Sequence, residues 1–298
     1  MKIKKSIPRK TFLAANTCFL LATGLICLLP FVNLLAISLS SQEAVGLGEV
    51  TFWPKDFTVS SYSFIIDNTI FIRTFMNSVV RVLLGVSINL VLIVLTAYPL
   101  SRSKEQFTAR NAYSWFFVVT ILFSGGMIPT FMVVRYTGLM NTIWSLVLPT
   151  ALPVFSMLVV MNFLRALPKE LEEAAFIDGA SHIQTLFRII LPVLKPSLAT
   201  VALFSIVTHW NAWFDGMLYM NRAESQPLQT YLRTIIINPG VFFSNNTVTA
   251  DVVEILRQIS PRTIRSAQLL IATIPMLLAY PFLQKHFTSG LVMGSVKG

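Results

Sequence analysis

The sequence predicts an all-α protein of the polytopic membrane class. Of its 298 residues, 54% are hydrophobic and only 12% are charged, and the mean hydropathy is +0.69. A soluble domain of this length needs a far more polar exterior. Several charge-poor windows reach the ~20 residues with which a helix crosses a hydrocarbon core of roughly 30 Å. The alternating segments of about ten residues that are typical of an outer-membrane barrel are absent.

We expect six membrane-spanning helices within a single domain, residues 1–298. The predicted spans cover residues 12–35, 76–100, 112–134, 144–164, 198–219 and 266–287. The basic start of the chain also fits a signal peptide, but the apolar run at 12–39 exceeds an h-region of roughly 7–15 residues. We therefore expect the first span to stay uncleaved.

Glycine and proline interrupt several predicted spans. The breakers are Ser124-Gly125-Gly126 with Pro129 in the third span, Pro149 and Pro153 in the fourth, and Pro275 and Pro281 in the sixth. Proline removes a backbone hydrogen bond and bends a helix, which a bundle tolerates when neighbours or cavity water satisfy the freed groups. The kinks fit either ordinary bent helices or a bundle around a water-filled path with movable gates.

The basic residues predict the orientation. The net charge is +10, and most Lys and Arg lie near the chain ends and in the connections 101–111 and 165–197. Because short cytoplasmic loops carry the excess of Lys and Arg, we expect both termini and the 165–197 loop to face the cytoplasm. No Arg-rich tract is interleaved with aromatics, which argues against a nucleic-acid partner.

The 165–197 loop contains a short predicted helix at 168–179. Pro168 suits a first helical position, and Gly179 suits the left-handed stop that follows a helix. Helical spacing groups Leu171, Ala174, Ala175 and Asp178 on one face and turns Glu172 and Glu173 elsewhere.

Small alanines on an exposed face would let another protein approach closely, and the glutamates could meet Arg or Lys on that partner. The alternative is an amphipathic connecting helix that lies on the membrane surface.

The fifth predicted span carries an unusual group of polar and aromatic residues. The candidate substrate-pathway residues are His209, Trp210, Asn211, Trp213 and Asp215. An ionisable group inside a span is costly and suggests function. Indole rings stack on sugar faces while amide and carboxylate groups bond hydroxyls, so the mixture suits a carbohydrate path. The alternative is an aromatic belt at the outer boundary with a capping aspartate.

The loop motif resembles the coupling loop of binding-protein-dependent ABC importer permeases. Glu173-Ala174-Ala175, then Gly179, then Ile189-Ile190-Leu191-Pro192 fill the EAA, Gly and I-x-LP positions of that family at the right spacing. The resemblance implies the type I importer permease fold, in which a cytoplasmic coupling helix docks on an ATP-binding subunit. The coupling residues that it implies are Glu173, Ala174, Ala175, Gly179, Leu191 and Pro192.

A second resemblance concerns the cargo. The Trp210-Asn211-Ala212-Trp213 stretch is similar to an element of carbohydrate-uptake permeases of the maltose type, and its flanks together with 124–129 and 294–298 look like the subfamily for complex oligosaccharides. This implies import of an oligosaccharide or polysaccharide fragment across the bacterial cytoplasmic membrane. It also implies a second, non-identical permease, two ATPase subunits and an extracytoplasmic sugar-binding protein. The 220–265 loop would then either reach that binding protein or serve as a flexible connector.

Several motifs are missing from the sequence. Without a G-x-x-x-x-G-K-[ST] phosphate loop, we expect ATP and Mg²⁺ on the partner ATPase and no cofactor in this chain. His182, His209 and His286 are scattered, and neither a G-x-S-x-G elbow nor paired acids support an enzyme. An ABC permease for a non-sugar solute would share the loop but not the aromatic fifth span. A secondary transporter or channel would need intramembrane charges, which are scarce apart from Asp215.

Overall fold

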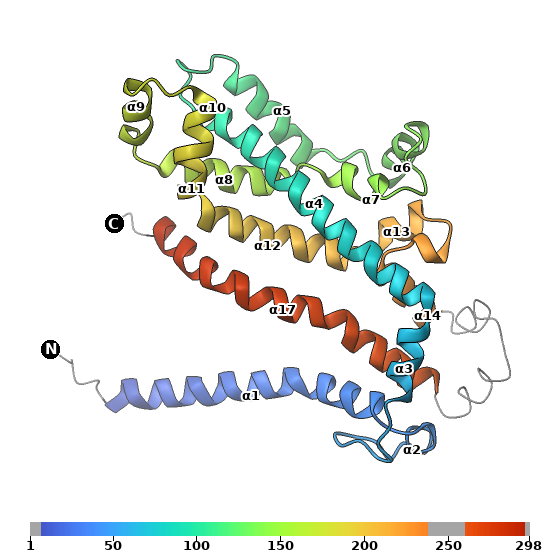
Figure 1. The fold of residues 1–298 in the computed structure, drawn as a ribbon. Coiled ribbons are helices and arrows are strands. Elements are labelled where there is room, and N and C mark those ends of the chain that lie inside the picture. The colour runs from blue at the N-terminus through green and yellow to red at the C-terminus, as the bar shows by residue number, and fades with distance from the viewer. Residues whose placement is uncertain (1–6, 238–259, 296–298) are drawn as a thin grey trace. The chain divides into compact units, whose positions relative to one another are not determined.

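The computed structural model describes residues 7–237 and 260–295, and every regular element in these two ranges is helical (Figure 1). Contacts divide the chain into two compact units. Unit 1 comprises Met1–Thr69 and Thr234–Thr273, and unit 2 comprises Ile70–Arg233 and Ile274–Gly298. The assignment of residues 1–298 to a single domain stays a prediction.

Unit 1 begins with α1, Ile7–Ser38, which contains the whole first predicted span. Its apolar side chains are exposed along most of the helix, as expected of a surface that faces lipid. Only its end is buried, where Ala36 and Ile37 pack with residues of the short helix α2, Gln42–Gly46. The Ser38 hydroxyl also lies 2.8 Å from the Tyr62 hydroxyl in α3, Ser60–Asp67.

Unit 2 holds most of the long helix α4 and the elements that follow it to Arg233. Their bounds are α4 Thr69–Ser101, α5 Arg110–Leu122, α6 Met127–Tyr136, α7 Trp144–Val147, η1 Leu148–Thr150, α8 Val154–Ala166, α9 Glu170–Ile177, α10 His182–Thr185, η2 Leu186–Ile190, α11 Leu191–Val193, α12 Lys195–Asn211, α13 Phe214–Tyr219, η3 Ala223–Ser225 and α14 Leu228–Ile237. The core of this unit joins α4, α8, η2 and α12 through apolar residues such as Ile93, Met157, Ile190 and Val201.

Three helix pairs are bent at short breaks, in the third and fourth predicted spans and just before the fifth. The bends are 115° between α5 and α6, 48° between Trp144–Thr150 and α8, and 79° between His182–Val193 and α12. Among the described residues, α1 and α4 are each long and apolar enough to cross a membrane, and the total is up to 5 if each bent pair is one span. The break before α6 falls at Gly126, whose φ of +83° is a left-handed conformation that glycine adopts without strain.

The breaks predicted in the third and fourth spans are therefore confirmed, and the sixth span differs. It lies within α17, Pro261–Ser295, which stays helical through Pro275 and Pro281. A proline removes one hydrogen bond from a helix, which bends it without necessarily ending it.

Candidate coupling loop and intramembrane polar site

The coupling helix predicted at 168–179 is α9. It begins at Glu170 rather than at Pro168, and Lys169 is its N-cap residue. Gly179 has a φ of +83°, and the amide of Ala180 donates to the Ala175 carbonyl at 2.9 Å. This left-handed stop, which closes the helix and turns the chain, confirms the prediction for Gly179.

The structure corrects the predicted exposed alanine face. Glu173 and Ala174 are exposed, whereas Ala175 is only 4% exposed. The helix α9 packs on α10, where the Phe176 and His182 rings meet edge to face at 4.8 Å. Helical spacing gives the angle between two side chains around the helix axis, but it does not say which side of the helix packs against a neighbour. The sequence alone therefore could not show that Ala175 is buried.

The prediction that Glu172 meets a basic residue of a partner is also corrected, because its carboxylate forms an ion pair within this chain. It forms an ion pair with Arg102, which lies just after α4, and the Arg102 guanidinium stacks 4.1 Å above the Tyr98 ring. Burial lowers the pKa of Arg102 from its usual value, while the charge of Tyr98 acts in the opposite direction. This contact fastens α9 to the end of α4 and leaves Glu173 as the exposed glutamate of the motif.

The loop presents apolar side chains that the motif does not mark. Ile177 is 85% exposed, and Ile183 and Phe187 are also largely exposed. Leu171 is exposed as well, on the same short helix as Ile177. Apolar residues inside a basic, otherwise polar connection were the available sequence signal for this surface.

The I-x-LP half of the motif anchors the loop. Leu191 packs against the core of unit 2, whereas Pro192 is exposed. Just before them, η2 is a π-helical turn, a rare form that often occurs at functional positions. The 79° bend before α12 follows, so the motif ends where the chain turns into the fifth predicted span.

The second candidate site lies along one face of α4. Asn77, Arg81, Gly85 and Asn89 recur every four residues and therefore lie on one stripe. Asn77 donates to the carbonyls of Glu224 and Gln226 at 2.9 and 3.2 Å, and Asn89 donates to those of Thr150 and Ala151 at 3.0 and 2.8 Å. The stripe supplies donors to backbone groups that helix breaks leave without helical partners.

Arg81 is the centre of this stripe, with an exposure of 1%. It pairs with Asp215, with one Nη1–Oδ1 distance of 3.1 Å, and donates to the carbonyls of Ala212 and Leu146 at 3.2 and 3.4 Å. Asp215 also accepts from the Gly216 amide at 2.8 Å, in the first turn of α13. Both groups are thus engaged where α12 ends and α13 begins.

The other predicted pathway residues divide into buried and accessible ones. His209 is buried, with Nε2 at 3.1 Å from Asn89 Oδ1, and Trp210 is buried with its ring edge-on to Phe75. Asn211 is exposed. Trp213 is partly exposed, and Arg233 of α14 lies 3.7 Å from its ring centroid.

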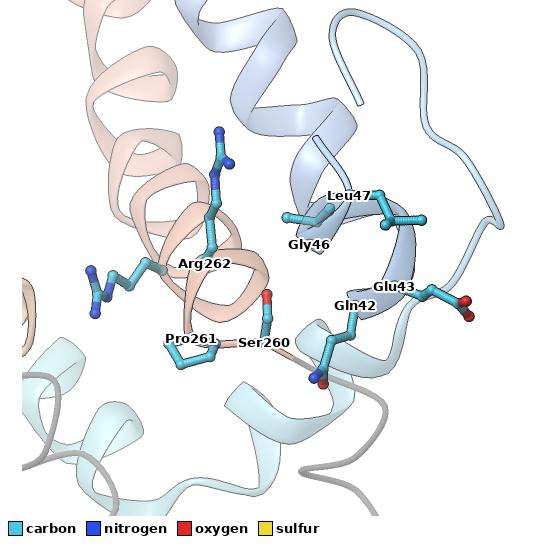
Figure 2. A pocket seen from close by; sticks show the side chains of 9 residues that line it. Gln42, Glu43, Gly46, Leu47, Ser260, Pro261 and Arg262 are labelled. Carbon is cyan, nitrogen blue, oxygen red and sulfur yellow. The ribbon is translucent and has the colours of Figure 1, made fainter. Parts of the chain in front are cut away.

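Each unit contains a cavity. In unit 2 a cavity of about 400 Å³ touches Asn89 and His209 and is lined mainly by α8 and α12. In unit 1 a hollow of about 950 Å³ lies between α2 and the start of α17, with Glu43, Arg262 and Arg265 among its charged lining residues (Figure 2). The segment 238–259, which is the central part of the 220–265 loop, lies outside the described residues.

Residues 67–292 match the family described as binding-protein-dependent transport system inner membrane component. The chain belongs to this family. Its members are membrane permeases of ABC importers rather than enzymes, and the all-α type I permease fold agrees with the helices described above.

Two relatives of the chain align over more than nine tenths of its length. It is 39% identical over 282 residues, 94% of this chain and 96% of the other, to the polygalacturonan/rhamnogalacturonan transport system permease protein of Bacillus subtilis (strain 168). It is 29% identical over 275 residues, 91% of each chain, to the melibiose/raffinose/stachyose import permease protein of the same organism.

A solved structure of an ABC transporter also matches the chain. The crystal structure of a bacterial ABC transporter involved in the import of the acidic polysaccharide alginate matches with a TM-score of 0.86 and 28% identity. The match covers 96% of this chain and 100% of the other. The chain is therefore a membrane-embedded permease component of a binding-protein-dependent ABC importer.

Proposed function

We propose that this permease imports a carbohydrate, either an oligosaccharide or a fragment of a polysaccharide. The observation that carries the proposal is the break between α12 and α13, where Asn211 and Trp213 remain accessible. Irregular backbone at membrane depth is tolerated where it lines a water-filled cavity. An amide and an indole at such a break suit a polyhydroxylated solute, and the sugar-import relatives align across this region.

The complete importer would contain a second, non-identical permease and two ATP-binding subunits that hold ATP and Mg²⁺. An extracytoplasmic sugar-binding protein would deliver the substrate, and this chain would hold no cofactor of its own. The exposed apolar side chains of the coupling loop, Ile177, Ile183 and Phe187, support docking to a protein. Both termini and this loop would face the cytoplasm of the bacterium, as the distribution of Lys and Arg favours.

Coupling in this arrangement passes through the Arg102–Glu172 contact. Closure of the ATPases on ATP would move α9, and the ion pair would transmit the motion to the end of α4. The polar stripe of α4 bonds to the broken ends of η1 and α12, so a shift of α4 would move those breaks with it. Substrate crosses because the two states of the importer differ in access and in affinity for the loaded binding protein.

The substitution Ile177→Asp tests the docking surface. Because Ile177 is 85% exposed, we expect the permease to fold and insert normally. A charge buried in this apolar contact should weaken binding of the ATPase by at least about 1.4 kcal/mol, which is roughly a factor of 10 in affinity. We therefore expect at least tenfold less ATPase to co-purify with the membrane subunits. Ile66→Asp, at a 66% exposed isoleucine of α3, is the matched control. Equal amounts of ATPase with both variants would contradict the proposal.

The cargo is tested in proteoliposomes that hold the whole importer and its binding protein. A panel of neutral and acidic oligosaccharides, amino acids and short peptides is added, and ATP hydrolysis and uptake are measured. We expect only carbohydrates to stimulate both. Stimulation by a peptide or amino acid alone would show that the cargo is not a carbohydrate.

A further inference from the structure

Trp213, one of the predicted pathway residues, forms a cation–π pair with Arg233. The Arg233 guanidinium lies 3.7 Å from the centroid of the indole, within the range of a cation–π contact. Trp213 also meets Phe214 edge to face at 5.5 Å, which helps to hold the orientation of the indole. A planar guanidinium stacked by its flat face keeps the N–H donors at its edges available.

Hydrogen bonds and close packing between α14 and its neighbours hold this pair in place. The Thr230 hydroxyl of α14 donates to the Trp213 carbonyl at 2.7 Å, and the Leu228 amide donates to the Ser78 hydroxyl of α4 at 2.8 Å. Gly216 also packs so closely on Thr230 and Pro227 that an added Cβ would clash with them. These contacts fix the start of α14 next to the break between α12 and α13, where Trp213 lies. Arg233 follows about one turn later on the same helix.

Among the described residues, no carboxylate compensates the charge of Arg233. Other arginines of unit 2 are neutralised; for example, Arg73 pairs with Glu224 at 2.7 Å and Arg81 pairs with Asp215. Within the described ranges, Arg233 forms no ion pair with a carboxylate and remains exposed. A cation that is held on an aromatic platform without an internal anion is suited to an external one.

We propose that Trp213 and Arg233 bind an acidic sugar residue of the uronate class. The guanidinium edge pairs with the sugar carboxylate, while the exposed part of the indole meets the apolar face of the sugar ring. This rests on the proposed carbohydrate import and narrows the cargo to acidic oligosaccharides. The names of two relatives agree with it, because one transports polygalacturonan and the other imports the acidic polysaccharide alginate.

The test measures uptake of trigalacturonate and of the neutral galactotriose by proteoliposomes containing the complete importer and its binding protein. Arg233→Met should lower the initial rate for limiting trigalacturonate roughly tenfold, the value expected for loss of a charge-assisted hydrogen bond. Any uptake of galactotriose should be unchanged, and Arg233→Lys should restore part of the trigalacturonate rate. Trp213→Leu should slow both sugars several-fold, because stacking does not depend on the carboxylate.

Arg222→Met is the matched control. Arg222 is also exposed and, within the described part of the chain, it stacks on no aromatic ring, so its loss should leave both rates unchanged. Wild-type trigalacturonate uptake by Arg233→Met, or equal losses in the two arginine variants, would overturn the uronate site. Wild-type import of galactotriose without trigalacturonate would also overturn it and leave carbohydrate import standing. Absence of uptake for every carbohydrate tested would refute the proposed function itself.

Discussion

Gly85 shows how a single residue sets a helix contact in this permease. It lies on the polar stripe of α4, directly against the buried ring of His209. A Cβ at this position would lie 2.5 Å from His209 Nε2, closer than real Cβ contacts occur. The absence of a side chain therefore allows α12 to approach α4 and lets His209 reach Asn89.

We expect Gly85→Ala to destabilise the protein by about 1–3 kcal/mol, the usual cost of overpacking. The melting temperature of the purified importer in detergent measures this effect. Gly24→Ala in α1, where an added Cβ meets nothing within 4 Å, is the control and should not lower the melting temperature. Adding His209→Ala to Gly85→Ala should cost less than the sum of the two single changes. Additive losses would mean that the two residues are not in contact.

At the scale of elements, the broken helices depend on α4. Its side chains bond to the ends of η1 and α12, which are the places where helical hydrogen bonding stops. The ion pair of Arg81 and Asp215 joins α4 to α13 in the same way. In the structure Asp215 holds two elements together, while its place on the substrate path stays a prediction.

We expect Asp215→Asn to lower the free energy of unfolding by about 3–5 kcal/mol, because it leaves the buried Arg81 charge without its partner. Arg81→Met combined with Asp215→Asn should lose less than the two single variants added together. Thermal unfolding of the three variants provides the measurement. A normal melting temperature for Asp215→Asn together with impaired uptake would instead favour a direct role in the path.

At the scale of the whole molecule, the predicted orientation in the membrane rests on charge. Basic residues gather at the chain ends and in the connections 101–111 and 165–197, and the coupling loop belongs to the second of these. An ATPase can drive the permease only if that loop is on the side where ATP is present. The orientation and the proposed coupling therefore depend on each other.

Site-directed labelling tests the orientation, after the exposed cysteines Cys18 and Cys27 are replaced by alanine. In intact cells whose outer face is accessible, we expect a membrane-impermeant maleimide to label Trp53→Cys but not Lys104→Cys in the 101–111 connection. Both native side chains are exposed and lie outside the proposed docking surface, so burial would not prevent labelling. Opening the membrane should make Lys104→Cys reactive. Labelling of Lys104→Cys in intact cells would contradict the predicted orientation.

Patterns that are local in the chain could be predicted from the sequence. Apolar length predicts membrane helices, glycine and proline predicted the breaks at Gly126 and before α8, and the EAA and I-x-LP spacing indicated the coupling loop. The left-handed stop at Gly179 is another feature that local sequence predicted. Each of these depends on the conformational preferences of a few neighbouring residues, so no knowledge of packing is needed.

Only the tertiary structure decided which of these residues face a neighbour. It buries Ala175, pairs Glu172 with Arg102, and joins Arg81 to Asp215 across 134 positions of sequence. It also sets Arg233 over Trp213, a contact that no spacing rule could predict. Side-chain periodicity fixes directions around a helix axis, but the partner in each direction depends on how distant helices pack.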